Sequence, residues 1–213
     1  MKTVPFNHVL MTRFNLATPG RELSIRTQPG WLESRFDLFE RYCLPSVAAQ
    51  TEHNFCWIIY FDKDTPPAFR ERIESLRSVT NFHPYFTGLF PASGWAQSIA
   101  EVVAPQAPLL LTTRLDSDDA LSKDFIERLQ ENVVAQTYAL GAYNFTNGLT
   151  RRGDRIYSLC HTSNAFFSWL ESSRNYQTAC TIPHMEVAEQ GHVYQLGGDP
   201  AWMQIIHDRN VSN

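Results

Sequence analysis

The sequence predicts an α/β fold, with one domain built on a mostly parallel central sheet that helices flank. Short apolar runs of strand length stop at charged residues, as in "FCWIIYFD" (55–62) and "APLLLTTRLD" (107–116). Between these runs, apolar residues recur every three or four positions, which indicates helices. Strands that alternate with helices of this length are typical of a parallel sheet covered by helices.

The first half of the chain supplies the first of these elements. Residues 8–14 predict a strand, residues 15–30 a loop that contains Gly and Pro, and residues 31–50 a helix. Pro45 should kink or restart that helix. Residues 55–61 predict a central strand, and Pro66 and Pro67 open the next helix. The apolar face of the helix over 31–50 consists of Leu32, Phe36, Phe39, Cys43 and Val47.

The alternation continues to about residue 138. Residues 81–86 predict a weak strand, 94–104 a helix, 107–115 a buried strand, and 122–134 a helix with Ser122 as its N-cap. Beyond this point, "YALGAYNFTNGLTRRGDRIYSLCH" (138–161) predicts two strands joined at the Asn147-Gly148 pair. The change of rhythm divides a single domain, 1–213, into halves of residues 1–121 and 122–213.

Composition excludes several classes of protein. The chain has 213 residues, 43% hydrophobic content and a formal net charge of -4, so it can bury a core and lacks the basic surface that nucleic acid requires. No apolar stretch reaches the ~20 residues that span a bilayer, so we expect a cytoplasmic protein. The four cysteines show no C-x-x-C spacing and are expected to be buried apolar residues.

Three carboxylates follow the strand at 107–115, and they are the strongest functional signal. Asp116, Asp118 and Asp119 lie where ligands collect in parallel α/β sheets, at the carboxyl end of a strand. In extended backbone Asp116 and Asp118 would face the same side, and two such oxygen ligands suit Mg²⁺ or Mn²⁺ bridging to phosphate. The alternative is that they cap the helix that follows.

Several segments together resemble one family. "VLMTRFN" (9–15), "RFDLFERYCLPSVAAQT" (35–51), "FCWIIYFD" (55–62), "RLDSDDAL" (114–121) and "WMQIIHDRNVSN" (202–213) occur in an order similar to the bacterial "putative rhamnosyltransferase" family. The "RLDSDDAL" segment itself resembles the D-x-D motif of GT-A fold glycosyltransferases. The resemblance implies a GT-A fold and sugar transfer from a nucleotide-diphosphate donor to a glycan or lipid-linked acceptor, in a cytoplasmic protein at or near the inner face of the membrane.

The resemblance also implies roles on the donor side. Residues 1–121 would bind the nucleotide sugar and residues 122–213 the acceptor. Asp118, Asp119 and His207 would bind Mn²⁺ or Mg²⁺, and mixed oxygen and imidazole ligation favours Mn²⁺. Two readings stay open for Asp62, base contact or a turn, and for Arg114, an ion pair with an aspartate or contact with the sugar. The nucleotide-sugar contacts would come from Arg13, Asn15, Asp62, Asp64, Arg114 and Asp116.

The acceptor side departs from the family pattern. An inverting GT-A enzyme usually places its general base in an x-E-D pattern at the start of a late helix, but "IPHMEVAEQGHVYQLGG" (182–198) lacks that pair. Glu186 is the first candidate base, His184 the second and Glu189 a weaker one. Trp202 is a candidate platform for the acceptor sugar, although most such aromatic residues belong to the core.

Three other classes compete with a glycosyltransferase. A nucleotidyltransferase needs a Gly-rich basic loop after its first strand, where this chain has one glycine in "RFNLATPGRELS" (13–24). A haloacid-dehalogenase-type phosphatase carries D-x-D on its first strand rather than mid-chain. A GT-A-like binding module without turnover is the strongest alternative, because of the missing E-D pair.

Overall fold

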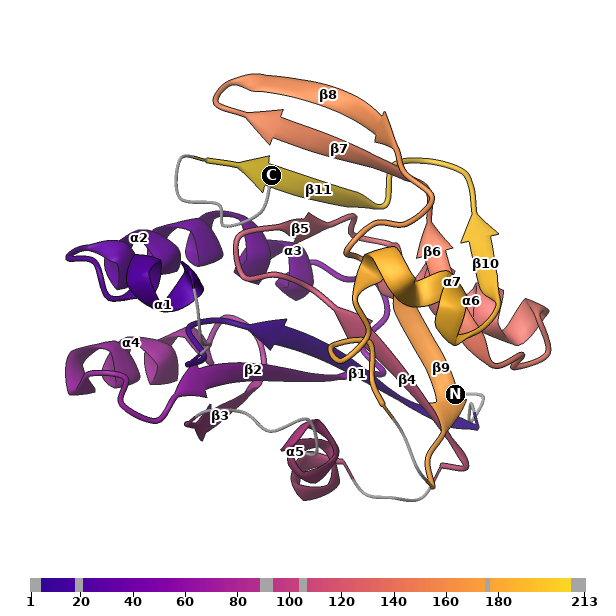
Figure 1. Ribbon diagram of the computed structural model, residues 1–213, viewed down its shortest axis with the longest axis horizontal. Helices are drawn as coiled ribbons and strands as arrows, with labels where there is room; N and C mark the ends of the chain where they lie inside the picture. Colours follow the sequence, from indigo (N-terminus) through magenta and orange to yellow (C-terminus); the bar gives the residue numbers. More distant parts are fainter. Residues whose placement is uncertain (1–4, 18–20, 89–93, 104–106, 175–176, 208–213) are drawn as a thin grey trace.

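A computed structural model describes residues 5–17, 21–88, 94–103, 107–174 and 177–207. Its main feature is a seven-stranded sheet with the order β10-β6-β9-β4-β1-β2-β3 (Figure 1). Four neighbouring pairs are parallel, and only β9 runs antiparallel to its neighbours β4 and β6. The predicted α/β fold with a mostly parallel sheet is therefore confirmed. The strands are β1 (Phe6–Arg13), β2 (Cys56–Asp62), β3 (His83–Thr87), β4 (Leu109–Arg114), β6 (Gly141–Phe145), β9 (Ser168–Ser172) and β10 (Val193–Leu196).

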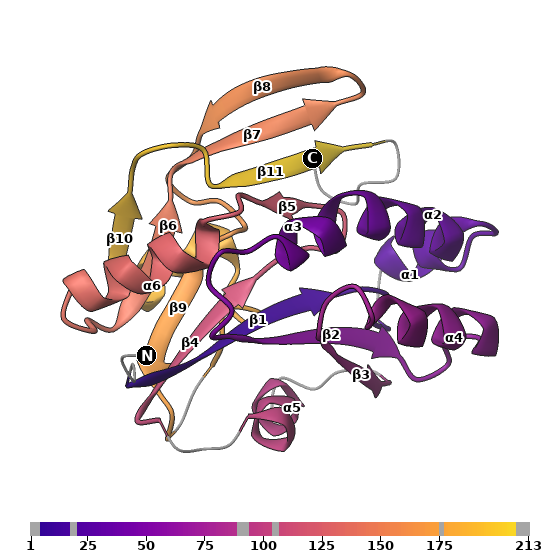
Figure 2. The same ribbon diagram turned by 180° about the vertical axis from the view of Figure 1, so that it is seen from behind.

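Alternation along the strands divides the interior into cores on the two faces of this sheet. On β1, Leu10 packs into the larger core, whereas Val9 and Met11 pack into the core on the opposite face. The larger core is covered by α2 (Trp31–Leu38), α3 (Leu44–Ala48), α4 (Pro67–Leu76) and α6 (Phe125–Ala135), and α5 (Gly94–Val102) covers the opposite one. Figure 2 shows the sheet from behind, with α6 and α4 in front of it.

The helix expected over 31–50 forms in three segments. Between α2 and α3 lies a π-helical turn, η1 (Phe39–Cys43), in which Leu44 N–H reaches back to the Phe39 carbonyl. Pro45 accounts for the restart, because it has no N–H to donate and its ring would crowd the carbonyl four residues earlier. The predicted apolar face is confirmed, since Phe36, Phe39, Cys43 and Val47 are buried and Leu32 packs against them.

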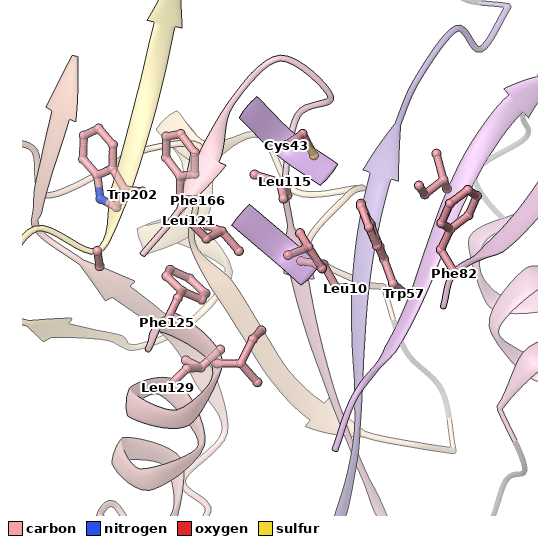
Figure 3. Close-up of a cluster of buried hydrophobic side chains, with 14 of the residues drawn as sticks. Leu10, Cys43, Trp57, Phe82, Leu115, Leu121, Phe125, Leu129, Phe166 and Trp202 are labelled. Carbon is pink, nitrogen blue, oxygen red and sulfur yellow. The ribbon is translucent and has the colours of Figure 1, made fainter. Parts of the chain in front are cut away.

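A second, four-stranded sheet sits above the large one in Figure 1, in the order β5-β11-β7-β8. Its strands are β5 (Ala120–Leu121), β7 (Asn147–Arg152), β8 (Arg155–Cys160) and β11 (Trp202–Ile206). The two sheets share a core in which Leu121 and Trp202 lie near Phe125 and Phe166, as the close-up shows (Figure 3). The acidic segment therefore connects β4 of one sheet to β5 of the other.

Four expectations about local structure were wrong. The loop at 15–30 contains a short helix, α1 (Arg21–Arg26). Asn147-Gly148 lies inside β7, and the turn falls instead at Gly153, which has a φ of 60°. Asp124 rather than Ser122 precedes α6 as its N-cap, while the Ser122 hydroxyl donates to the Asp124 carboxylate. Cys160, on the edge strand β8, is exposed, and Cys56 and Cys180 are partly exposed, whereas Cys43 is buried as predicted.

Candidate functional site

A cavity of about 450 Å³ opens at the carboxyl ends of β1 and β4, between the two sheets. One side of it, the strand-end wall, comes from these strand ends, the acidic segment, α1 and α2. The other side, the loop wall, comes from β8, the segment after it and a 3-10 turn, η2 (His184–Glu186). The strand-end wall includes Arg13, Asn15, Arg26, Trp31, Arg35, Arg114, Asp116, Asp118 and Asp119, and the loop wall includes Leu159, His161, Ser163, Asn164 and His184.

The acidic segment forms a turn instead of the extended backbone that the sequence suggested. Asp119 N–H donates to the Asp116 carbonyl at 3.1 Å, which bends the chain between β4 and β5. Asp116 and Asp118 still line the same cavity. Because of this turn, the two carboxylates bind different arginine side chains.

Asp116 is held by two arginines from the neighbouring strands. Arg114 Nη2 lies 3.0 Å from Asp116 Oδ2, and Arg13 Nη2 lies 3.9 Å from Asp116 Oδ1. Burial alone would raise the pKa of Asp116, but the charges of Arg114 and Arg13 outweigh it and lower that pKa to about 2. Of the two readings for Arg114, the structure shows the ion pair. Asp116 is consequently a stable anion that keeps two guanidinium groups beside the cavity.

Asp118 receives a cation and an imidazole on a single oxygen. Arg35 Nη1 lies 2.7 Å from Asp118 Oδ2, and His207 Nε2 lies 2.8 Å from the same atom. The pairing of β11 with β5, in which Met203 lies opposite Ala120, brings His207 to the acidic segment across 89 residues. The predicted neighbours Asp118 and His207 are therefore in contact.

Asp119 is buried, and its carboxylate is hydrogen-bonded to the backbone of β11. Its Oδ1 accepts the backbone N–H of Ile205 at 2.8 Å. Burial raises the pKa of Asp119, and the charges of Asp118 and Asp116 raise it further, well above its usual range. The carboxyl group joins the acidic turn to the strand that carries His207.

The remaining donor-side candidates lie near the end of β2, but only one of them lines the cavity. Asn15 lines the cavity, and its Oδ1 accepts the Asp62 N–H at 3.0 Å. Asp62 lies behind it and binds Arg26 Nη1 at 2.6 Å, while Arg26 also donates to the Asn15 carbonyl. The side chain of Asp64 is 76% exposed and pairs with Lys63. Asp62 therefore orders the cavity from behind, and Asp64 lies outside it.

The acceptor-side candidates separate in the same way. His184 lines the cavity, whereas Glu186 and Glu189 are exposed and do not. Burial lowers the pKa of His184, and the charges of Arg114 and His161 lower it further, so the imidazole is neutral at pH 7. Trp202 borders the cavity but is buried, with its ring stacked on Phe166 at 4.7 Å and its indole N–H bound to the Phe145 carbonyl.

Sequence patterns missed two arginines and, apart from His184, the polar residues of the loop wall. Arg26 lies on the unpredicted helix α1, and Arg35 lies on α2 one turn after Trp31, whose ring centroid is 5.2 Å from its guanidinium carbon. An arginine one turn after an aromatic residue, on the helix that follows the first strand, was the available signal for Arg35. His161, Ser163 and Asn164 belong to a segment without periodicity and gave none.

Among the described residues, Asp118 and His207 are the candidate cation ligands that are in contact with each other. Within the described ranges, no three His, Cys, Asp or Glu side chains gather as a metal-binding group. Asp118 and His207 nonetheless present one carboxylate and one imidazole that converge. This pair fits the way in which Mg²⁺ and Mn²⁺ are held by one or two protein ligands, with substrate phosphates and water completing the shell.

Comparison with known proteins identifies what the chain resembles. A family model described as "Putative rhamnosyl transferase" matches residues 7–213. The curated proteins gave no match. Among the described helices, none combines the length and the hydropathy needed to cross a bilayer.

Solved structures share the fold. "Crystal structure of S. aureus TarS 1-349" superposes with a TM-score of 0.58 at 9% identity, over 93% of this chain and 60% of that one. The same fragment in complex with UDP gives 0.52 at 11% identity, over 94% and 60%. "Crystal structure of S. aureus TarS" gives 0.53 at 10% identity, over 94% and 36%. The chain thus spans less than two thirds of TarS and has a GT-A-like fold.

Proposed function

The chain belongs to the family described as "Putative rhamnosyl transferase", and from this premise we propose that it is a metal-dependent glycosyltransferase. It would move a sugar from a nucleotide-diphosphate donor to a glycan or lipid-linked acceptor. The observation that carries the proposal is the strand-end wall, where Arg13, Arg26, Arg35 and Arg114 surround one cavity together with Asp116 and Asp118. A guanidinium group can donate two parallel hydrogen bonds to the oxygens of a phosphate group. The cavity also lies at the strand ends, where GT-A-like sheets would place a nucleotide.

The residues of the strand-end wall would orient the donor. Asp116 fixes Arg114 and Arg13, so these cations are preorganised for the diphosphate. Asp118 and His207 would hold the divalent cation, and the cation would neutralise charge on the departing nucleoside diphosphate. Asn15, fixed by its bonds to Asp62 and Thr65, would contact the nucleoside.

The loop wall would present the acceptor. His184 lines the cavity with a lowered pKa, so its neutral ring can accept the proton of an acceptor hydroxyl. We therefore place the base at His184 ahead of Glu186, and the reaction would invert the sugar's configuration. On the same wall, β8 exposes Tyr157 and Leu159, which share one face of the strand, and Leu159 also lines the cavity. An apolar strip that continues into the cavity suits a lipid-linked acceptor and a position at the inner face of the membrane.

The alternative function is a GT-A-like module that binds a nucleotide sugar without turnover. The observation that favours it is the exposure of Glu186, which removes the expected carboxylate base from the cavity. A module of this kind would bind the nucleotide as tightly as an enzyme does. It would release neither the free sugar nor the nucleoside diphosphate.

Asp118→Asn tests the proposal, because the substitution keeps the shape of the side chain and removes the charge that would bind the cation. We expect nucleoside diphosphate release from a panel of nucleotide sugars with Mn²⁺, beginning with UDP- and dTDP-activated sugars, to fall by about two to three orders of magnitude. Asp37→Asn is the matched control, since Asp37 is exposed and pairs with Arg72 away from the cavity.

Three results would count against parts of this proposal. Full activity of Asp118→Asn would contradict its role in binding the cation, and full activity in excess chelator would contradict metal dependence. Donor binding without release of nucleoside diphosphate, tested with a range of glycan and lipid-linked acceptors, would establish the binding module. Thermal unfolding of both variants confirms that each retains the fold.

A further inference from the structure

The carboxylate of Asp118 has two partners that cannot both remain when a cation binds. Arg35 Nη1 and His207 Nε2 lie 2.7 and 2.8 Å from the same atom, Oδ2. The three side chains are only 12–18% exposed, so water screens them weakly. Imidazole can exchange its hydrogen bond for a metal bond at nearly the same position, but a guanidinium group cannot.

Electrostatics decides which partner leaves. A divalent cation held by Asp118 and His207 would be close to the Arg35 guanidinium, which is bound to the same carboxylate oxygen, and like charges that close repel strongly even near a protein surface. Arg35 is therefore a competitor for the place that the cation would take. Its charge is permanent, so it can leave only by moving.

The structure also provides a place to which Arg35 can move. Arg35 lines the cavity beside Arg13 and Arg114, and the only described contacts of its guanidinium group are Asp118 and the ring of Trp31. Trp31 lies one turn earlier on α2, and its ring contacts the guanidinium group at 5.2 Å, a weak contact compared with the ion pair to Asp118. Because Arg13, Arg35 and Arg114 line one cavity, a diphosphate bound there would lie within reach of the guanidinium group when it leaves Asp118.

We propose that Arg35 is a displaceable counter-ion of Asp118, which holds the carboxylate before the donor enters and turns to the donor's diphosphate when the cation binds. The inference rests on the proposed function. It makes Arg35 a positioning residue that links the binding of the cation to the binding of the donor, because one movement opens the metal ligand and adds a phosphate contact. Binding of either one then favours the other by the same factor.

Direct binding of Mn²⁺ in the absence of nucleotide tests the idea, with free Mn²⁺ followed by electron paramagnetic resonance. We expect Arg35→Gln to bind Mn²⁺ more tightly than the wild type by about tenfold or more, because one repelling charge has gone. Arg35→Lys keeps the charge and should resemble the wild type. Arg72→Gln is the matched control, since Arg72 pairs with Glu33, Asp37 and Glu40 outside the cavity and should not alter Mn²⁺ affinity.

A second measurement separates competition from a general loss of structure. In saturating Mn²⁺, Arg35→Gln should bind UDP more weakly than the wild type, since the phosphate contact is lost while the metal site is filled. Asp118→Asn combined with Arg35→Gln should abolish the tightened Mn²⁺ site. A merely structural Arg35 would shift the melting temperature without tightening Mn²⁺ binding.

Different outcomes overturn different statements. Unchanged or weaker Mn²⁺ binding by Arg35→Gln would overturn the counter-ion, while Mn²⁺-dependent transfer by the wild type would leave the proposed function intact. If Mn²⁺ binding is still tightened when Asp118→Asn is combined with Arg35→Gln, the cation binds elsewhere. That result would also overturn the role of Arg35 as the counter-ion of Asp118. Sugar transfer that persists in excess chelator would show that the proposed function does not need a metal. If neither the wild type nor Arg35→Gln binds Mn²⁺, the proposed role of Arg35 as a counter-ion is overturned.

Discussion

The two walls of the cavity differ in how their polar groups are held. On the strand-end wall, the cationic side chains are paired with carboxylates: Arg26 with Asp62, Arg35 with Asp118, and Arg114 with Asp116. On the loop wall the polar groups are hydroxyl, amide and imidazole groups, and among the described residues that line the cavity the carboxylates all come from the acidic segment. A wall of preorganised charge suits a diphosphate, and a wall of hydroxyl, amide and imidazole groups without carboxylates suits the hydroxyl groups of an acceptor.

The largest expected effect lies on the loop wall and tests whether it takes part in chemistry. We predict that His184→Ala lowers the rate of sugar transfer by about 10²–10⁴, the usual contribution of a general base, with UDP affinity retained. Glu186→Gln, one turn away and exposed, should change the rate little. The comparison of the two walls fails if Glu186→Gln is the inactive variant, because the base would then come from outside the cavity.

The pH dependence of the rate sharpens the same test. Burial and the charges of Arg114 and His161 lower the pKa of His184, and a base works only in its neutral form. The rate should therefore hold as pH falls to the ordinary value of histidine, about 6.5, and decline only below it. A rate that halves above that value would indicate a different base.

How much could be predicted from the sequence also differs between the walls. Asp116 and Asp118 were predicted to face a ligand because they follow the end of a strand, and a parallel sheet brings strand ends to one edge. Arg13 and Asn15 were predicted through the family resemblance. Through the same resemblance, Asp118 and His207 were predicted to lie together as ligands of one cation. The structure explains their proximity by the pairing of β11 with β5, a contact between distant segments that local periodicity does not encode.

The missed residues share a physical cause. Arg26 and Arg35 reach the cavity because of the rotation of α1 and α2 against the sheet, which depends on the packing of whole helices. His161, Ser163 and Asn164 lie in an irregular segment where hydrogen bonds fix the backbone, such as the bonds from Asn164 to the Phe145 and His161 carbonyls. Asn147-Gly148 misled the prediction because Gly148 is needed for close packing rather than for a turn.

That packing gives the next prediction, on the small sheet that carries the loop wall. A Cβ added at Gly148 would lie 2.2 Å from atoms of the Trp202 ring, whereas one added at Gly197 would meet nothing within 4 Å. Gly148→Ala should lower the free energy of unfolding by about 1–3 kcal/mol, because Trp202 is buried and its indole N–H is bound to the Phe145 carbonyl. Gly197→Ala should be near neutral in the same urea titration. Equal stability of the two variants would mean that the small sheet can shift to make room for the added Cβ at little cost in free energy.

The smallest expected effect belongs to the large sheet, where His8 is buried on β1 beside Thr113 and Gln130. Burial lowers the pKa of His8 to about 3. The unfolded chain then takes up a proton that the folded chain does not, so stability is complete above the unfolded pKa, about 6.5, and falls as pH decreases toward the folded value. Between pH 6.5 and 5 this single group should remove about 1.6 kcal/mol from the free energy of unfolding. His8→Gln has no proton to gain, so its urea midpoint should fall less over that range than the wild type's, even if its stability at pH 7 is lower. If the urea midpoints of both proteins fell equally with pH, His8 would be protonated in the folded state as well. Water would then reach this part of the large sheet.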